Sequence, residues 1–355
     1  MILLLLLVIA ITLFIQFAPV FGGKPDAQSM AKLMLSDQFD GEVFRNLMPT
    51  DVATPSDQEV SIMDFLNPPA GKIPAEPLPS KQFRKDSLTN GDFVWFGHST
   101  VLMRTNDVTI ITDPVFYNAS PIPFTVTPFA LQVENRISDL PEIDVVLISH
   151  DHYDHLDYQA IQEMDPKVKK YLVPLGVKAH LQRWGVADSK IVEMDWYESD
   201  LEGVVRFTFA PARHFSGRGL NNRLSTLWGS WVVQSNSSSV YFSGDSGYSE
   251  EFKKIGDQFG PFDIAFLEDG AYNPAWDQIH MYPEESVQAS IDLNAKVYFP
   301  IHWGKFDLST HTWTDPITRA HQSARQKNVQ LATPVIGDVF SADDYPQSNW
   351  WSDIQ

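Results

Sequence analysis

Three histidines and an aspartate lie within six consecutive positions, at His150, His152, Asp154 and His155. Residues 145–148, just before them, are apolar and β-branched, which is typical of a buried strand. The cluster is therefore expected in the loop at the C-terminal end of that strand. Side chains two positions apart point the same way in an extended segment, so His150 and His152 converge on one point. Imidazoles and carboxylates bind zinc; a surface loop that happens to be rich in histidine is the alternative.

Three further candidate ligands lie much later in the chain, at His214, Asp245 and His302. Each follows an apolar segment that is expected to form a strand. In layered α/β folds, binding sites form where the C-terminal ends of strands meet. Any one of these residues alone is more often a structural residue than a ligand. Their shared placement at strand ends predicts that they join the histidine cluster.

The number of candidate ligands indicates how many metal ions are bound. One catalytic zinc ion with an open coordination position takes three protein ligands. The candidates are His150, His152, Asp154, His155, His214, Asp245 and His302. They suit two ions about 3.5–4 Å apart that share a bridging carboxylate and hold a nucleophilic hydroxide. The chain has no Gly-x-Ser-x-Gly elbow, which weighs against serine catalysis.

The composition bounds the class of protein. The chain has 355 residues, of which 43% are hydrophobic, so one large domain or two ordinary ones can form a core. With 45 acidic and 26 basic residues, the net charge is −19, which makes nucleic acid a poor candidate partner. There are no cysteines, so disulfides and thiolate metal sites are excluded. The oligomeric state is left open.

Apolar runs and turn residues alternate through the middle of the chain in a pattern that predicts an α/β fold. The expected strands cover residues 93–96, 101–104, 108–112, 145–148, 170–174, 204–212, 227–234, 240–243, 264–267 and 296–301. The expected helices cover residues 27–35, 159–164, 176–184 and 283–292. Residues 116–130 are aromatic and proline-rich, and we interpret them as a loop that packs on its own core or forms an apolar lip beside the site.

We expect three parts along the chain. Residues 1–21 are almost continuously apolar and lack a clear cleavage site, which favours a membrane anchor over a cleaved signal segment. Either interpretation predicts an exported protein, membrane-anchored (on the periplasmic face if bacterial) or secreted after cleavage. Residues 22–84 form an extended, Pro-rich linker or a wrap over the domain surface, with a cluster of prolines at Pro68, Pro69, Pro74, Pro77 and Pro79. The catalytic domain is expected over residues 85–345.

These residues resemble the metallo-β-lactamase superfamily, because residues 150–155 match its His-x-His-x-Asp-His signature. The sequence is most similar to the N-acylphosphatidylethanolamine-hydrolysing phospholipase D family. The matching stretches run in order from about residue 93 to residue 305. They are residues 96–100, 112–116, 148–157, 173–176, 227–231, 244–248, 259–263, 270–274 and 301–304.

The resemblance implies an αββα sandwich with two Zn²⁺ ions at one edge, although other divalent transition metals are possible. One zinc ion would take His150, His152 and His214, and the other Asp154, His155 and His302. Asp245 would bridge them. His280 matches a family histidine near the scissile phosphate, so Asp154 and His280 are the residues assigned to catalysis.

Other polar residues receive secondary roles. His98, Asp113 and Asp157 are candidates for orienting the ligands from outside. His180, His311 and His321 match no motif and are expected at the surface. Glu268 and Asp269 depart from the family pattern and bring two carboxylates towards the pocket, which favours a neutral substrate over an anionic one.

Three functions follow from this pattern. The first is a dizinc phosphodiesterase that cleaves a phospholipid on the headgroup side of phosphorus, with the bridging hydroxide as nucleophile. The second is a lactonase or another ester or amide hydrolase that uses the same metal ions on a small molecule. The third is a non-catalytic, membrane-tethered metal-binding module, which the full ligand set disfavours because a structural zinc site needs only four ligands.

Overall fold

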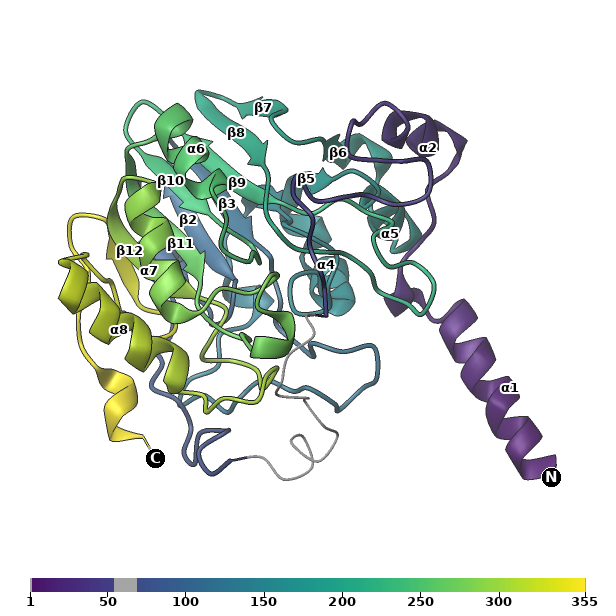
Figure 1. The fold of residues 1–355 in the computed structure, drawn as a ribbon, viewed down its shortest axis with the longest axis horizontal. Helices are drawn as coiled ribbons and strands as arrows, with labels where there is room; N and C mark the ends of the chain where they lie inside the picture. Colours follow the sequence, from purple (N-terminus) through teal and green to yellow (C-terminus); the bar gives the residue numbers. More distant parts are fainter. Residues whose placement is uncertain (1, 54–68, 355) are drawn as a thin grey trace.

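The structure, a computed structural model, describes residues 2–53 and 69–354. Two β-sheets pack face to face, and helices cover the outer face of each (Figure 1). The apolar residues form three layers that match this arrangement, one between the sheets and one under the helices on either side. The predicted αββα sandwich is therefore confirmed.

The first sheet has seven strands in the order β13-β1-β2-β3-β4-β5-β6. Its strands are β1 (Asp92–Trp95), β2 (Val101–Thr105), β3 (Val108–Thr112), β4 (Ile143–Leu147), β5 (Val168–Pro174), β6 (Ile191–Met194) and β13 (Val339–Ser341). Strands β3 to β6 run parallel. Along β4, Val145 faces the other sheet and Val146 faces the helices, so the strand is apolar on both sides, as a buried parallel strand must be.

The second sheet has six strands in the order β12-β11-β10-β9-β8-β7. Its strands are β7 (Ser199–Glu202), β8 (Val205–Ala210), β9 (Ser230–Gln234), β10 (Ser239–Phe242), β11 (Phe262–Glu268) and β12 (Ala295–Ile301). Strands β10, β11 and β12 run parallel, so their C-terminal ends meet at one edge. Phe266 and Phe299 pack across the interior with ring centroids 5.0 Å apart.

Helices close both outer faces. On the first sheet lie α4 (Tyr158–Met164) and α5 (Lys178–Arg183), and on the second lie α6 (Glu251–Phe259), α7 (Pro283–Asp292) and α8 (Asp315–Lys327). Helix α7 begins with Pro283 and has Glu285 bonded back to the main chain of Tyr282, a capping arrangement that fixes its start. Sequence analysis did not predict α6 or α8.

The N-terminal region begins with α1 (Ile2–Phe17), which projects from the body in Figure 1, and continues through α2 (Ala27–Leu33). Among the described residues, no helix combines the length and apolar character that a membrane crossing requires. The membrane anchor stays a prediction.

The described parts of the predicted linker pack against the domain. Leu33, Phe44 and Leu78 are buried within the layer between the two sheets. The Phe44 amide also donates a hydrogen bond of 2.8 Å to the Leu224 carbonyl. These residues thus wrap the domain and contribute to its core, while Pro68, predicted within the linker, lies outside the described residues.

We expect Phe44→Ala to lower the free energy of unfolding by about 3–5 kcal/mol, because it empties a fully buried aromatic site. Urea unfolding of the full chain measures this loss. The matched control is Phe124→Ala at a ring that is 91% exposed, where the change stays within about 0.5 kcal/mol. Equal unfolding curves for the two variants would show that this wrap contributes nothing to the core.

Candidate metal centre

The predicted ligands come from loops at the C-terminal ends of strands. His150 follows β4, His214 follows β8, Asp245 follows β10 and His302 follows β12. Since the parallel strands of both sheets end at the same edge of the sandwich, these loops meet there. The structure brings all seven predicted ligands together at this edge.

One group comprises His150, His152, His214 and Asp245, whose candidate ligand atoms all lie within 4.8 Å of one another. The Nε2 atom of His150 is 2.9 Å from Nδ1 of His152, and Nε2 of His214 is 3.3 Å from the same Nδ1. Three imidazole nitrogens therefore face a common point, as the first predicted ligand set requires.

A second group comprises Asp154, His155 and His302, together with His98. Asp154 Oδ2 is 3.3 Å from Nε2 of His302 and 3.5 Å from Nε2 of His155. It is also 3.0 Å from Nε2 of His98, which is almost fully buried. His98 thus contacts a predicted ligand directly, which agrees with the orienting role expected of it.

Asp245 lies between the two groups. Its Oδ1 is 3.1 Å from Nε2 of His155, and its Oδ2 is 3.1 Å from Nε2 of His302. Oδ2 is also 3.7 Å from Nε2 of His214 and 3.8 Å from Nε2 of His150. This is the place that a carboxylate shared by two ions would occupy.

Several buried ligand atoms of the site have no hydrogen-bond partner in the part of the chain that the structure describes. Within the described chain, Nε2 of His155, Oδ1 of Asp245 and both ring nitrogens of His302 are buried and make no hydrogen bond of normal geometry. Buried polar atoms almost always have a hydrogen-bond partner. A group of buried nitrogen and oxygen atoms without partners therefore indicates a bound ion. The buried His and Asp clusters fit a binuclear metal site, and imidazole and carboxylate ligands suit zinc and other divalent transition metals.

The electrostatics of the site agree with this fit. Burial holds the pKa of His150 and His214 well below the usual histidine value, which keeps these rings neutral as metal ligands must be. Burial opposes the charged form of Asp245, but the charges of His155 and His302 outweigh it and hold its pKa well below the usual range. For His302, burial is likewise outweighed by the Asp245 carboxylate, which raises its pKa to about 10. The carboxylates therefore favour positive charge at this end of the site, which a bound cation supplies.

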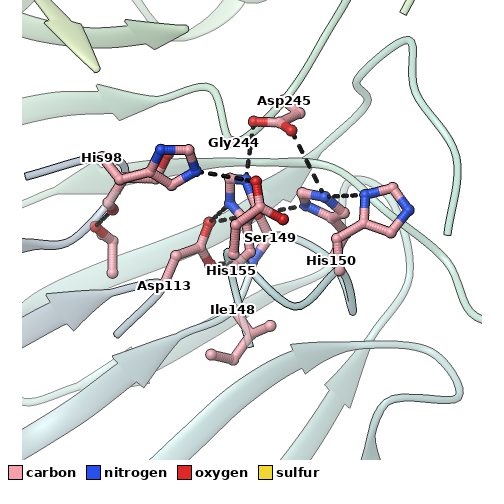
Figure 2. A network of polar contacts seen from close by, with 12 residues as sticks. His98, Asp113, Ile148, Ser149, His150, His155, Gly244 and Asp245 are labelled. Atoms are coloured by element: carbon pink, nitrogen blue, oxygen red, sulfur yellow. Dashed lines mark hydrogen bonds and ion pairs between the residues drawn. The ribbon is translucent and has the colours of Figure 1, made fainter. Parts of the chain in front are cut away.

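Asp113 supports the ligands from behind. Its carboxylate accepts hydrogen bonds from the main-chain N–H of Ser149 at 2.7 Å and from the Ser149 hydroxyl at 2.5 Å, and contacts Nδ1 of His155 at 2.7 Å (Figure 2). The Ser149 Oγ atom is in turn 2.9 Å from Nδ1 of His150. One buried carboxylate thus directs Nε2 of two rings into the site, as predicted for Asp113.

Three residues of the site have left-handed backbone conformations. The φ angles are +55° for His98, +34° for Asp113 and +68° for His302, a region that non-glycine residues rarely adopt. Reciprocal main-chain hydrogen bonds hold two of them, since His302 N donates to His98 O and His98 N donates to Trp303 O, both at 3.0 Å. Such strain is retained where the surrounding structure enforces a functional geometry.

Other predicted roles change. Asp157 is the N-cap of α4 and also accepts hydrogen bonds from the main chain of Phe116 and Tyr117, so it supports a loop and touches none of the predicted ligands. The surface prediction for His180 is wrong, because His180 is buried with Nε2 3.2 Å from Asp151 Oδ2. His311 and His321 are half-buried rather than exposed.

A cavity of about 290 Å³ opens onto the metal ligands. Its other walls are Val52, Phe215, Arg223, Ala271, Trp276, Ile279, His280 and Leu308. Arg223 packs its guanidinium 4.8 Å from the centre of the Phe215 ring. Arg223 and Val52 are not among the site residues predicted from the sequence. Only the positive charge of Arg223 could have marked it as a residue that binds an anion.

Glu268 lies beneath this cavity at the end of β11. It is completely buried, its Oε1 contacts Nδ1 of His280, and its Oε2 accepts a hydrogen bond of 2.5 Å from Ser246 N. Burial and the nearby charge of Asp245 raise its pKa well above the usual range. Burial raises the pKa of Asp269 in the same way. Burial therefore disfavours the charged form of both carboxyls that depart from the family pattern, which opposes the negative charge expected from the sequence.

Comparison with known proteins agrees with this geometry. A family model described as a beta-lactamase superfamily domain matches residues 109–303. An uncharacterized protein of Mycobacterium tuberculosis is 38% identical over 318 residues, covering 87% of this chain and 85% of that protein. The N-acyl-phosphatidylethanolamine-hydrolyzing phospholipase D 1 of Caenorhabditis elegans is 32% identical over 349 residues, covering 91% and 90%. The crystal structure of isothiocyanate hydrolase from Delia radicum gut bacteria has a TM-score of 0.54 at 18% identity, covers 70% of this chain and 98% of that one, and shares the fold.

We expect Asp113→Asn to weaken metal binding about 10- to 100-fold, because the amide presents a donor to the Nδ1 proton of His155. Competition with a chromophoric chelator measures the affinity. Asp157→Asn is the control, since it changes a buried aspartate that touches none of the predicted ligands. If both variants bind metal as tightly as the unaltered chain, Asp113 does not support the site.

Proposed function

Because the chain belongs to the metallo-β-lactamase superfamily, we propose that it cleaves an N-acylphosphatidylethanolamine-type phospholipid on the headgroup side of phosphorus, with two zinc ions bound. That it is a metal-dependent hydrolase follows from the family and from the buried His and Asp clusters. The finer proposal, a phosphodiester substrate, is supported by the similarity to the worm phospholipase D. The observation that carries it is the charge of the cavity.

Arg223 contributes positive charge to the wall, beside the Asp154 and Asp245 carboxylates that would hold the ions. The Arg223 side chain is exposed at the cavity, and none of the described carboxylates forms an ion pair with it. The two carboxyls that would repel an anion, Glu268 and Asp269, are buried and have raised pKa values. Guanidinium forms paired hydrogen bonds with phosphate oxygens, so Arg223 is positioned to bind the anionic part of a phosphodiester.

The remaining walls are suited to the apolar part of such a lipid. Phe215, Trp276, Ile279 and Leu308 line the cavity and present apolar surface to a ligand. A long acyl chain gains binding free energy from contact with such a wall. The proposed substrate therefore has a charged phosphodiester at Arg223 and the metal ligands, and an apolar chain along these side chains.

In the reaction, the bound metal ions would activate water and neutralise charge on the phosphoryl oxygens. Asp154 is held by His98 and His302 in position to fix one of the ions. His280 lies beside the ligands, with its candidate ligand atom within 4.8 Å of those of Asp245 and His302. Because its Nδ1 is turned to Glu268, its Nε2 is the ring atom left to face the cavity.

The state of the Glu268–His280 pair determines what His280 donates. Burial lowers the pKa of His280 to about 4, and burial raises the pKa of Glu268. A protonated Glu268 donates its O–H to Nδ1 and thereby keeps the imidazole proton on Nε2. His280 then donates a hydrogen bond to a phosphoryl oxygen or to the leaving oxygen as negative charge develops there.

We propose that α1 brings the protein to its lipid substrate. Leu5, Leu6 and Phe17 on this helix are about 60% exposed, which is unusual for such large apolar side chains. An apolar helix that lies in the headgroup region anchors a protein at a membrane surface. The export of the chain, and its attachment on the outer side of that membrane, belong to the same proposal.

The test is an assay of the zinc-loaded full chain with N-acylphosphatidylethanolamine in mixed micelles and with a long-chain lactone. We expect phosphodiester cleavage, and little lactone hydrolysis. Arg223→Gln should raise KM for the phospholipid about 10- to 100-fold, since it removes a charge-assisted hydrogen bond of about 1.5–3 kcal/mol. His152→Ala should abolish turnover. Turnover of the lactone alone would favour the ester hydrolase, and turnover of neither with zinc bound would favour the non-catalytic module.

We expect Glu268→Leu to lower kcat about 10- to 100-fold, because His280 loses the partner that fixes its tautomer. Glu268→Gln should keep kcat within about threefold, since its amide donates to Nδ1 as a protonated carboxyl does. The metal content of both variants, measured by elemental analysis, should not change. A Gln variant as impaired as the Leu variant would mean that Glu268 works as an anion.

A further inference from the structure

A short stretch between α1 and α2 is fixed to the body by its main chain. We call residues 17–23 the N-terminal strap. The Trp184 indole N–H donates to the Pro19 carbonyl at 2.7 Å. The Arg183 guanidinium donates to the carbonyls of Gly22 at 2.8 Å and of Phe17 at 2.9 Å. The partners of these hydrogen bonds are 161–166 positions apart in the sequence, so the strap is a tertiary contact and not a local turn.

Arg218 connects the strap to the metal loop, by which we mean residues 149–157. Its Nε donates to the Val20 carbonyl at 3.1 Å. Its Nη1 donates to the carbonyls of Asp151 and Leu156, both at 2.7 Å. The side chain is only 2% exposed, with its guanidinium 4.2 Å from the centre of the Tyr153 ring. One buried cation therefore binds the strap and two points of the metal loop, Asp151 and Leu156, with three predicted ligands between them.

His180 makes a second connection. The Gly23 N–H donates to His180 Nδ1 at 3.0 Å, which leaves the proton on Nε2. Nε2 lies 3.2 Å from Asp151 Oδ2, and the other oxygen of Asp151 accepts from Gly217 N at 2.7 Å. Asp151 lies between His150 and His152 in the chain. The strap is therefore connected to the first two ligands through the side chains of His180 and Asp151.

The strap fits closely at Gly22. This residue is buried, has a φ angle of +76°, and a Cβ atom there would lie 2.1 Å from His180 Nδ1. A side chain at this position therefore pushes the strap away from His180. The contact requires glycine for both its backbone conformation and the absence of a Cβ.

Loss of the strap would leave buried polar groups without partners. Arg218 Nε and His180 Nδ1 would face water or nothing, and a buried donor without a partner costs about 1–3 kcal/mol. Groups outside the ligands that hold them in place change metal affinity about 10- to 100-fold when they are removed. The strap carbonyl at Val20 is such a group, acting through Arg218.

We propose that the N-terminal strap is a permanent support of the metal loop and stays on the working protein, with Arg218 as the positioning residue. Cleavage between α1 and the strap is compatible with a loaded metal site. Cleavage after Gly23, which would remove the strap together with a signal segment, is not compatible with a loaded metal site. The proposal concerns metal binding and does not depend on the identity of the substrate.

Two truncations test it. One chain begins at Phe17 and lacks only α1, and the other begins at Lys24 and lacks the strap as well. Zinc affinity is measured by competition with a chromophoric chelator, and the rise in Tm that zinc produces is recorded for each. We expect the first chain to match the full chain within about twofold, and the second to bind at least about tenfold more weakly. Equal affinity in both chains would overturn the proposal.

Point variants keep the test decisive if the shorter chain fails to fold. Gly22→Ala places a Cβ against His180, whereas Gly91→Ala has a similar positive φ angle with open space around it. Arg218→Lys cannot hold Val20, Asp151 and Leu156 together, whereas Arg206→Lys changes an exposed arginine on β8. We expect tenfold weaker zinc binding for the first of each pair only, with the Tm of the zinc-free chain little changed. Unaltered affinity in Arg218→Lys would refute the positioning role.

The mature N-terminus gives an independent answer. The intact mass of the full chain, purified from the membrane and soluble fractions of expressing cells, shows where it begins. We expect a first residue at or before Phe17 in every fraction that contains zinc. A zinc-loaded protein that begins after Gly23 would overturn the proposal.

Discussion

The structure depends on the burial of histidine and carboxylate side chains that cannot satisfy one another. Imidazole nitrogens of His155 and His302 and the carboxylate of Asp245 lie about 3.1 Å apart without hydrogen bonds of normal geometry. In a protein interior such groups are costly unless a partner supplies what they lack. Two cations that share a carboxylate would supply it, and the strand ends hold these groups in place.

The fold meets this requirement through strand ends and through a second set of contacts behind them. Each ligand loop starts at the edge where parallel strands end, which fixes its main chain. The loop between β4 and α4 carries four of the predicted ligands, so the orientation of several rings must be fixed within one short segment. Asp113 therefore orients the rings of His150 and His155 from one side, and Arg218 binds the main chain of the loop from the other. Strained backbone at His98, Asp113 and His302 shows that the surroundings, and not local preference, set these positions.

The sequence predicted what is encoded locally. Strands β4 and β12 and helix α7 have apolar runs or end signals of their own, and the ligands stand directly beside them. Helix α8 has only small or scattered apolar residues such as Ala320 and Ala324, so its period is too weak to detect. The contacts that link distant residues were also missed. Glu268 pairs with His280, and Arg218 binds Val20 across 198 positions, and neither partner is marked by any spacing. The surface expectation for His180 rests on the lack of a motif around it, and its partner Asp151 lies 29 positions away in the sequence.

The charge of the whole chain and the charge of the cavity have opposite consequences for an anionic substrate. A net charge of −19 repels an anionic lipid at long range, but salt screens that repulsion over about 8–10 Å. Binding is then decided by the groups within that distance of phosphorus. There, Arg223 is positive, bound metal ions would add to that charge, and burial raises the pKa of Glu268 and Asp269, which disfavours their charged forms. Selection for an anion is therefore possible in an acidic protein, provided that these two carboxyls stay out of water. The burial of Glu268 and Asp269 therefore weakens the objection to an anionic substrate that their residue types raise.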